Sequence, residues 1–324
     1  MLALLSAAAV LGAAAAPAAG AASPAPTAAA SAVPSAAGPR RPLGALPAAQ
    51  PLDHAPSPPA PAPDAGVLLR DAQARVRRGH EDPATEVDRW AVHLATDPES
   101  GTALRRYARY RALIEGALAA RGLPRDLAFL PWVESEWKNE ATSRAGAAGM
   151  WQLMPATARA YGLEVSAYVD ERRDPVRATN AAARHLSDLY RETHDWHTAL
   201  AAYNAGVGRT GRARGAFWSR RWTLPAETRA YVPHVLAAAR VGRAPRGWGL
   251  DAGETLPLRF REVWVPGGIA LDSVAHRLGA DPSALRDLNP HLTRGITPPG
   301  RRWPVRVPAQ PSPPSRTLLP APAP

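Results

Sequence analysis

Apolar residues recur every three or four positions through most of the chain between residues 67 and 246, which is the spacing of one face of an α-helix. Gly122 and Gly206 follow two of these runs as helix-ending residues, and Asp174 precedes Pro175 as an N-cap precedes the first helical position. The pattern predicts helices over residues 67–79, 84–95, 102–122, 176–192, 196–206 and 225–242. This part of the chain is therefore expected to be mainly α-helical.

A further helix is predicted to begin near Pro124 and to run through residue 141. At about 100° per residue, Glu134 shares an arc of roughly 80° with apolar residues such as Leu130 and Trp137. Pro131 lies within this segment and is expected to kink the helix or to restart it. A carboxylate among apolar side chains is costly, so Glu134 either caps or pairs with a partner there, or serves a chemical purpose.

The pattern changes after Gly247. Residues 259–266 and 301–308 resemble β-strands, and residues 271–279 and 283–289 between them have the spacing of two short amphipathic helices. This order predicts a second, small α+β module of βααβ type over residues 258–308.

Both ends of the chain have compositions that do not favour a packed core. Residues 1–22 are apolar with small residues near position 20, as in a secretory signal peptide, although no basic residue precedes the apolar run. Residues 23–64 and 309–324 are rich in Pro and Ala and predict a linker and a tail. Because the chain has no Cys, we expect no disulfide and no lipoprotein anchor. The signal-peptide-like segment predicts an exported protein of the periplasm or cell envelope.

The net charge of +11 indicates an anionic partner, such as a cell-envelope surface. Lys138 is the one Lys among 39 basic residues, so the Arg content is also what a GC-rich genome would produce. No basic stripe with interleaved aromatic residues occurs, and we expect no nucleic-acid binding.

The segment AGAAGMWQLMP, which follows Glu134, combines small residues with groups that suit a carbohydrate. Its Ala and Gly residues allow close backbone approach. Met150, Trp151 and Met154 offer apolar surface, and Gln152 offers an amide. We therefore expect a sugar-binding surface here.

Several motifs occur in order along the helical part. LPRDLAFLPWVESEW occupies residues 123–137, GMWQ occupies 149–152, DERRDP occupies 170–175, AYNAG occupies 202–206, and ETRAYVP occupies 227–233. In this order and spacing they resemble the lytic transglycosylases of the membrane-bound D type, within the goose-type lysozyme group, over about residues 104–249. The GMWQ motif departs from the family pattern by having Met where Leu is usual.

The resemblance implies a lysozyme-like all-α catalytic domain over residues 65–249, with an N-terminal helical extension. Its implied substrate is the glycan strand of peptidoglycan, cleaved between MurNAc and GlcNAc. Glu134 occupies the position of the catalytic glutamate, which acts as an acid and then as a base while the sugar's 6-hydroxyl closes a 1,6-anhydro ring. Other matching positions contact the acid or the glycan: Ser143, nine residues after the acid, and Gln152, Tyr203, Asn204 and Tyr231. Met154, from the apolar surface described above, is expected to hold the glycan with them.

Burial explains how such a glutamate works. A carboxylic acid in an apolar cleft has its charged form disfavoured, so its pKa rises and it can donate a proton near neutral pH.

A usual glycosidase needs a second carboxylate. The candidates are Asp170, Glu171, Asp174, Asp195 and Glu227. Glu227 lies one helical turn before Tyr231 and could face the same cleft, but a first-turn acid favoured by the helix dipole is the preferred interpretation. The resemblance implies no second acid.

His194 and His197 raise the question of a metal. No third ligand follows at zinc spacing, so no metal site is expected. The sequence has no phosphate-binding loop or dinucleotide fingerprint, and we expect no cofactor.

The C-terminal module resembles a LysM domain in degenerate form, from WVPGGIALDSVAHRLGADPSALRDLNP and the closing TPPGRRWPVRVP. Gly268 and Ile269 stand where that family has Asp and Thr. Two alternatives remain open for this module, which are glycan binding and packing against the catalytic domain. For the whole chain, the alternatives to a transglycosylase are a hydrolytic lysozyme and a catalytically silent peptidoglycan-binding protein.

Overall fold

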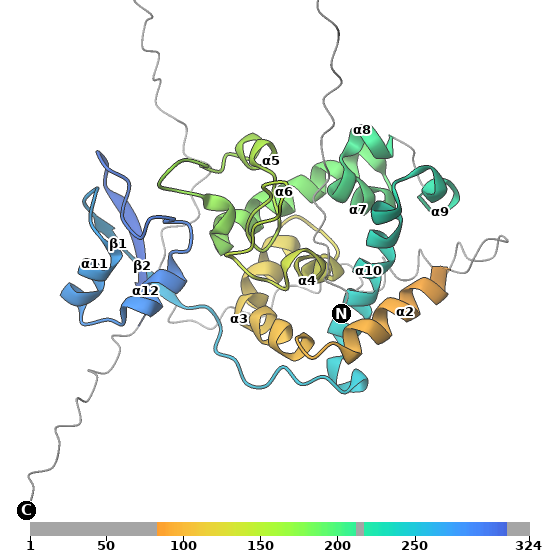
Figure 1. The fold of residues 1–324 in the computed structure, drawn as a ribbon, viewed down its shortest axis with the longest axis horizontal. Coiled ribbons are helices and arrows are strands. Elements are labelled where there is room, and N and C mark those ends of the chain that lie inside the picture. Colours follow the sequence, from red (N-terminus) through yellow and green to blue (C-terminus); the bar gives the residue numbers. More distant parts are fainter. Residues whose placement is uncertain (1–82, 212–216, 310–324) are drawn as a thin grey trace, which may run out of the picture.

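The computed structural model describes residues 83–211 and 217–309 (Figure 1). The expected signal peptide, the linker, the helix over residues 67–79 and almost all of the tail lie outside the described residues. Within them, the chain forms a large helical body and a small C-terminal module, drawn in blue at one end of the molecule. The fold is mainly α with a small α+β module, as predicted.

Five longer helices build the helical body, and each overlaps a predicted one. They are α2 (Pro83–Thr96), α3 (Ser100–Ala119), α6 (Pro175–Thr193), α7 (Trp196–Ala205) and α10 (Ala226–Arg243). Helix α10 packs against α2 and α7, while α3 and α7 both contact α6. Ala residues such as Ala182, Ala201 and Ala238 are completely buried in these helices, which lets the backbones approach closely. No helix of the described residues is long and apolar enough to cross a membrane.

Shorter elements connect these helices. They are η1 (Arg125–Phe129), α4 (Leu130–Ser135), α5 (Pro155–Ala160), η2 (Glu171–Arg173), α8 (Val207–Thr210), α9 (Phe217–Arg220), η3 (Arg221–Thr223) and η4 (Pro245–Trp248). The predicted start of α6 is confirmed, because the Asp174 carboxylate accepts hydrogen bonds from the backbone N–H groups of Val176 and Arg177.

The helix expected to begin near Pro124 does not run through to residue 141, but the restart expected at Pro131 is confirmed. The segment is the 3₁₀ helix η1 followed by α4, with Pro131 in the first turn of α4, where its missing N–H costs nothing. Helix α4 ends at Ser135, because Glu136 and Trp137 have the left-handed φ angles 54° and 57°. Trp137 is nevertheless buried, and its ring stacks on that of Tyr107 with the centroids 5.0 Å apart. Packing of this ring compensates for a backbone conformation that non-Gly residues rarely adopt.

A buried arginine holds the loop of residues 141–153 against the start of α6. The Arg172 guanidinium forms hydrogen bonds of 2.8 Å with both carboxylate oxygens of Asp170, and donates to the carbonyl oxygens of Gly146 (2.6 Å) and Leu153 (3.1 Å). Gly149 lies against this segment with φ +80°, and a Cβ atom there would lie 1.8 Å from the Arg172 carbonyl oxygen. The close approach expected of these glycines is therefore realised between two parts of the chain.

The C-terminal module has the predicted βααβ order. Its elements are β1 (Phe260–Val265), α11 (Leu271–Leu278), α12 (Pro282–Leu288) and β2 (Trp303–Pro308). The strands are antiparallel, with Phe260 opposite Pro308 and Val265 opposite Trp303. The module has a small hydrophobic core of its own, which includes Val169 from the helical body.

Buried charges reinforce this docking. Arg306 of β2 lies 2.8 Å from a carboxylate oxygen of Asp174, and the side chains of both residues are almost completely buried. Burial alone would raise the pKa of Asp174, but the charges of Arg306 and His291 lower it below its ordinary value. At the edge of the contact, Arg301 pairs with Glu164 at 2.6 Å. Of the two alternatives for the module, packing against the helical body is therefore observed, while glycan binding stays a prediction.

The position of Gly149 predicts a large difference between two glycine substitutions. Gly146→Ala introduces a Cβ at φ +87° that meets no atom within 4 Å, so it is expected to cost about 1–2 kcal/mol of backbone strain. Gly149→Ala adds the clash with Arg172 and is expected to cost more than about 4 kcal/mol. Urea unfolding followed by circular dichroism measures both. Equal losses would show that the loop moves away from Arg172 without penalty.

Candidate functional site

Glu134, the penultimate residue of α4, lies at the centre of the candidate site. Its side chain is partly buried, and its carboxylate accepts a hydrogen bond of 2.5 Å from the hydroxyl of Tyr231 on α10. Burial raises the pKa of Glu134 to about 7, the Tyr231 hydrogen bond opposes this rise, and the negative charge of Glu227 adds to it. The group therefore exists in both protonation states near neutral pH.

Two tyrosines line the acid without competing for its proton. Burial raises the pKa of Tyr231 well above 10, with further contributions from Glu134 and Tyr203. The pKa of Tyr203 is also raised by burial and by the charge of Glu134. The Tyr203 hydroxyl donates a hydrogen bond of 2.7 Å to the carbonyl oxygen of Trp151, so it joins α7 to the GMWQ loop. Both tyrosines remain hydroxyl groups at any pH at which Glu134 titrates.

Asn204 and Glu227 occupy the solvent side of the site. The Asn204 amide donates to Glu227 at 3.3 Å and accepts a hydrogen bond of 2.9 Å from the hydroxyl of Thr228. Glu227 is exposed in the first turn of α10, which agrees with the preferred interpretation of this residue. Its charge is nevertheless close enough to raise the pKa of Glu134, so it also belongs to the surroundings of the acid.

The GMWQ loop has an outer and an inner side. Gln152 and Met154 are partly exposed, whereas Met150 and Trp151 are completely buried. The Trp151 indole N–H donates a hydrogen bond of 2.9 Å to Thr179 on α6. The prediction that Met150 and Trp151 form a sugar-binding surface is therefore wrong, because both side chains belong to the hydrophobic core. The Gln152 side-chain amide donates a hydrogen bond of 2.8 Å to the carbonyl oxygen of Gly149. Gln152 itself has a left-handed φ of 46°.

Ser143 lies in the same loop, and its hydroxyl accepts a hydrogen bond of 3.0 Å from the N–H of Ala147. Its contact with the acid stays a prediction. The hydroxyl of Ser135, next to Glu134 in the chain, donates to the carbonyl oxygen of Met150 at 2.9 Å and so fixes the end of α4 to the loop.

Two parts of the chain match known protein families. Residues 112–221 match the family described as Transglycosylase SLT domain. This range includes Glu134, the loop of residues 141–153 and α7. The helical body is therefore similar to the transglycosylase SLT domain over these residues. Residues 259–321 match the family described as Lytic transglycosylase MltD, LysM-like domain. The resemblance found in the sequence is thus confirmed for both parts of the chain.

Individual relatives are similar over parts of their length. The membrane-bound lytic murein transglycosylase D of Escherichia coli K12 is 37% identical over 191 residues, which are 56% of this chain and 42% of the relative. The peptidoglycan transglycosylase gp16 of Escherichia phage T7 is 34% identical over 158 residues, 44% of this chain and 12% of the relative. The lytic transglycosylase Slt of Pseudomonas aeruginosa, a solved structure, has a TM-score of 0.37 and 28% identity over 43% of this chain and 24% of its own. The chain thus spans less than half the length of these relatives.

Sequence reasoning overlooked two residues that hold the loop of the candidate site in place. Arg172 lies in the recognised DERRDP motif, where two adjacent arginines between acidic residues were the available signal. Nothing in that pattern shows that Arg172 reaches the carbonyl oxygens of Gly146 and Leu153. Ser135 adjoins the acid and carried no signal of its own. Within the described residues, no three His, Cys, Asp or Glu side chains come together as metal ligands.

Opposite substitutions around Glu134 are expected to move its pKa in opposite directions. Tyr231→Phe removes the hydrogen bond that favours the carboxylate, so the pKa of Glu134 should rise above its value of about 7. Glu227→Gln removes a repelling charge, so the pKa should fall. Carbon-13 NMR titration of the labelled carboxyl group measures both.

A matched control is Glu136→Gln. The Glu136 carboxylate is paired with Lys138 at 2.7 Å and with Arg106 at 3.4 Å, so its removal should leave the pKa of Glu134 unchanged. Shifts of the same sign in Tyr231→Phe and Glu227→Gln would contradict the assignment.

Proposed function

We propose that the protein is a lytic transglycosylase that cleaves the β-1,4 bond between MurNAc and GlcNAc in peptidoglycan and leaves 1,6-anhydroMurNAc ends. The observation that carries this proposal is Glu134, a partly exposed carboxyl group in an SLT domain whose pKa is raised to about 7 by burial. The names of the relatives, which are transglycosylases of murein or peptidoglycan, support the same substrate.

Glu134 acts first as the general acid. In its protonated form it donates its proton to the glycosidic oxygen as the bond to C1 of MurNAc breaks, and GlcNAc leaves with a free hydroxyl. The carbonyl oxygen of the MurNAc N-acetyl group stabilises the positive charge that develops at C1. The Tyr231 hydrogen bond favours the carboxylate that Glu134 becomes, so it assists this first transfer.

Glu134 then acts as the general base. Its carboxylate takes the proton of the MurNAc 6-hydroxyl while that oxygen forms its bond to C1, which closes the 1,6-anhydro ring and restores the protonated acid. No water is consumed. A pKa of about 7 suits both steps, because neither protonation state is strongly disfavoured at neutral pH.

The glycan is held by the partly exposed groups around the acid. Gln152 and Met154 supply an amide and an apolar surface on the loop side, and Asn204 supplies an amide whose orientation is fixed by Thr228 and Glu227. Tyr203, whose hydroxyl proton is engaged by Trp151, offers lone pairs to a sugar hydroxyl. Ser143 orients the acid from the loop.

Hydrolysis is the second candidate, and Glu227 favours it. A hydrolytic lysozyme with two carboxylates needs a base that activates water, and Glu227 is exposed and near enough to influence Glu134. A catalytically silent peptidoglycan-binding protein has less support, since a raised carboxyl pKa serves no purpose in binding a neutral sugar. All three functions place the protein in the periplasm or cell envelope after export, where its net charge of +11 suits an anionic surface.

Mass spectrometry of fragments released from purified sacculi tests the reaction. The wild type is expected to release products one water lighter than reducing muropeptides, at a rate that falls as the pH rises above about 7, where Glu134 loses its proton. Glu134→Gln keeps the shape of the side chain but cannot donate, so its rate should fall by about 10²–10⁴-fold.

Glu136→Gln is the matched control and should retain the wild-type rate, because its carboxylate is engaged by Lys138 and Arg106. Reducing ends in the products would establish hydrolysis and direct attention to Glu227. Activity near wild type in Glu134→Gln would overturn the proposed role of this residue.

A further inference from the structure

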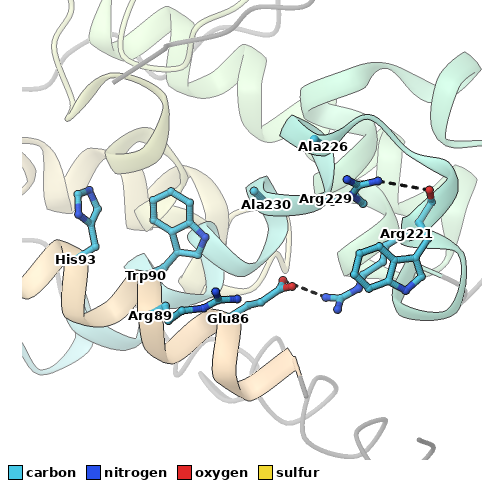
Figure 2. Close-up of a pocket in the computed structure, with 9 residues that line it drawn as sticks. Glu86, Arg89, Trp90, His93, Arg221, Ala226, Arg229 and Ala230 are labelled. Atoms are coloured by element: carbon cyan, nitrogen blue, oxygen red, sulfur yellow. Dashed lines mark hydrogen bonds and ion pairs between the residues drawn. The ribbon is translucent and has the colours of Figure 1, made fainter. Parts of the chain in front are cut away.

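A cavity of about 530 Å³ lies between α2 and the segment that leads into α10 (Figure 2). The side chains that define its chemistry are Glu86, Arg89, Trp90, Arg221, Trp222 and Arg229. Its size is within the range of small-ligand sites. Neither Glu134 nor any residue assigned above to the glycan lines it, so it is a separate site on the same helical body.

Arg221 is the most deeply buried group of this cavity. Its side chain is 2% exposed, and Nη1 lies 3.1 Å from a carboxylate oxygen of Glu86. Nη2 is buried and has no hydrogen-bond partner among the described residues. The guanidinium carbon lies 5.2 Å and 4.6 Å from the ring centroids of Trp218 and Trp222, which fix its orientation. A buried guanidinium N–H without an acceptor is unfavourable, and an oxyanion in the cavity would satisfy it.

Two further arginines make the cavity electropositive. Arg229 lies over the same Trp222 ring, with its guanidinium carbon 5.4 Å from the centroid, and Arg89 is exposed on α2. The contacts of Arg229 with the carbonyl oxygens of Trp222 and Leu224, at 3.5 Å and 3.4 Å, are long, so its N–H groups can turn to a stronger acceptor. Against these three cations, the cavity contains one acid, Glu86.

Glu86 and the aromatic walls narrow the choice of anion. A phosphate carries up to two negative charges near neutral pH, so Glu86 would repel it more strongly than a singly charged carboxylate. The carboxylate of an amino acid lies next to an N–H or ammonium group, from which Glu86 can accept a hydrogen bond. An apolar side chain of that amino acid can pack on the rings of Trp90 and Trp222. The combination of paired guanidinium donors, one acceptor and apolar walls therefore fits the carboxylate end of a peptide.

We propose that this cavity binds a carboxylate of the peptide stems carried by the glycan strand, with Arg221 and Arg229 as its donors. The proposal rests on the proposed function, since such stems come with a peptidoglycan substrate. Helix α10 connects the two sites, because Arg229 and Ala230 line the cavity and the next residue, Tyr231, donates to Glu134. A stem held here positions its strand relative to the acid, so the site selects stem-bearing glycan.

Isothermal titration calorimetry with the stem tetrapeptide L-Ala-γ-D-Glu-meso-diaminopimelyl-D-Ala tests the cavity directly. Arg229→Gln should weaken binding about tenfold, the loss expected for one charge-assisted hydrogen bond. Arg220→Gln is the matched control, because it removes an equal charge from an exposed neighbour that does not line the cavity, and it should bind as the wild type does. Unchanged binding in Arg229→Gln overturns the proposal, as does inorganic phosphate binding as tightly as the peptide.

Cleavage assays separate this proposal from the proposed function. On stem-bearing strands, Arg229→Gln should be slower than the wild type, while on strands stripped of their stems by an amidase the two rates should be equal. If no strand is cleaved but peptide binding still depends on Arg229, the proposed function fails and the binding site stands. If strands are cleaved and the wild type and Arg229→Gln show the same preference for stem-bearing strands, the proposed function is supported and the proposed binding site is overturned.

Discussion

The Arg172 guanidinium is the contact on which the arrangement of the candidate site depends. It is almost completely buried, and Asp170 neutralises its charge through two parallel hydrogen bonds of 2.8 Å. Its remaining Nη1 donors reach the carbonyl oxygens of Gly146 and Leu153, on either side of the GMWQ motif. Removal of the Arg172 side chain would deprive the buried Asp170 carboxylate of two short hydrogen bonds, with Arg173 remaining 3.6 Å away, and would take one donor from each of two carbonyl oxygens. Such losses are costly in a protein interior. The loop that faces Glu134 therefore keeps its shape through a residue that never contacts the acid.

The same short segment joins the two parts of the protein. Asp174, two residues after Arg172, caps α6 and pairs with Arg306 of the LysM-like domain. Val169, three residues before Arg172, belongs to the hydrophobic core of that domain. The LysM-like domain thus packs onto the segment that supports the loop of the candidate site. A weaker interface between the LysM-like domain and this segment would therefore disturb the N-cap of α6. Through Arg172, it would also disturb the loop of residues 141–153.

Opposing interactions set the acidity of Glu134. Burial disfavours its charge most strongly, Glu227 adds repulsion, and Tyr231 stabilises the carboxylate. One carboxyl group is proposed to give a proton and then to take one back. A pKa of Glu134 near neutral pH therefore serves both steps better than a pKa far above or below it. Helix α10 supplies both Glu227 and Tyr231, which lie one helical turn apart and act on the acid with opposite sign. Besides burial, the two groups that act on the acid therefore come from one helix, which also lines the cavity that contains Arg221.

Local sequence determined the longer helices, the Asp174 cap, the βααβ order of the small domain and the motifs that identify the SLT domain. These features depend on residues that are close in the chain, so periodicity and capping preferences suffice to predict them. Tertiary structure alone decided where α4 ends, because Glu136 and Trp137 adopt left-handed angles that only the burial of the Trp137 ring makes tolerable. It also decided that Met150 and Trp151 face the core, and that Tyr231 reaches Glu134 from 97 residues away. Contacts of this kind join residues whose separation carries no period, and they exist only when the helices that bear them have packed.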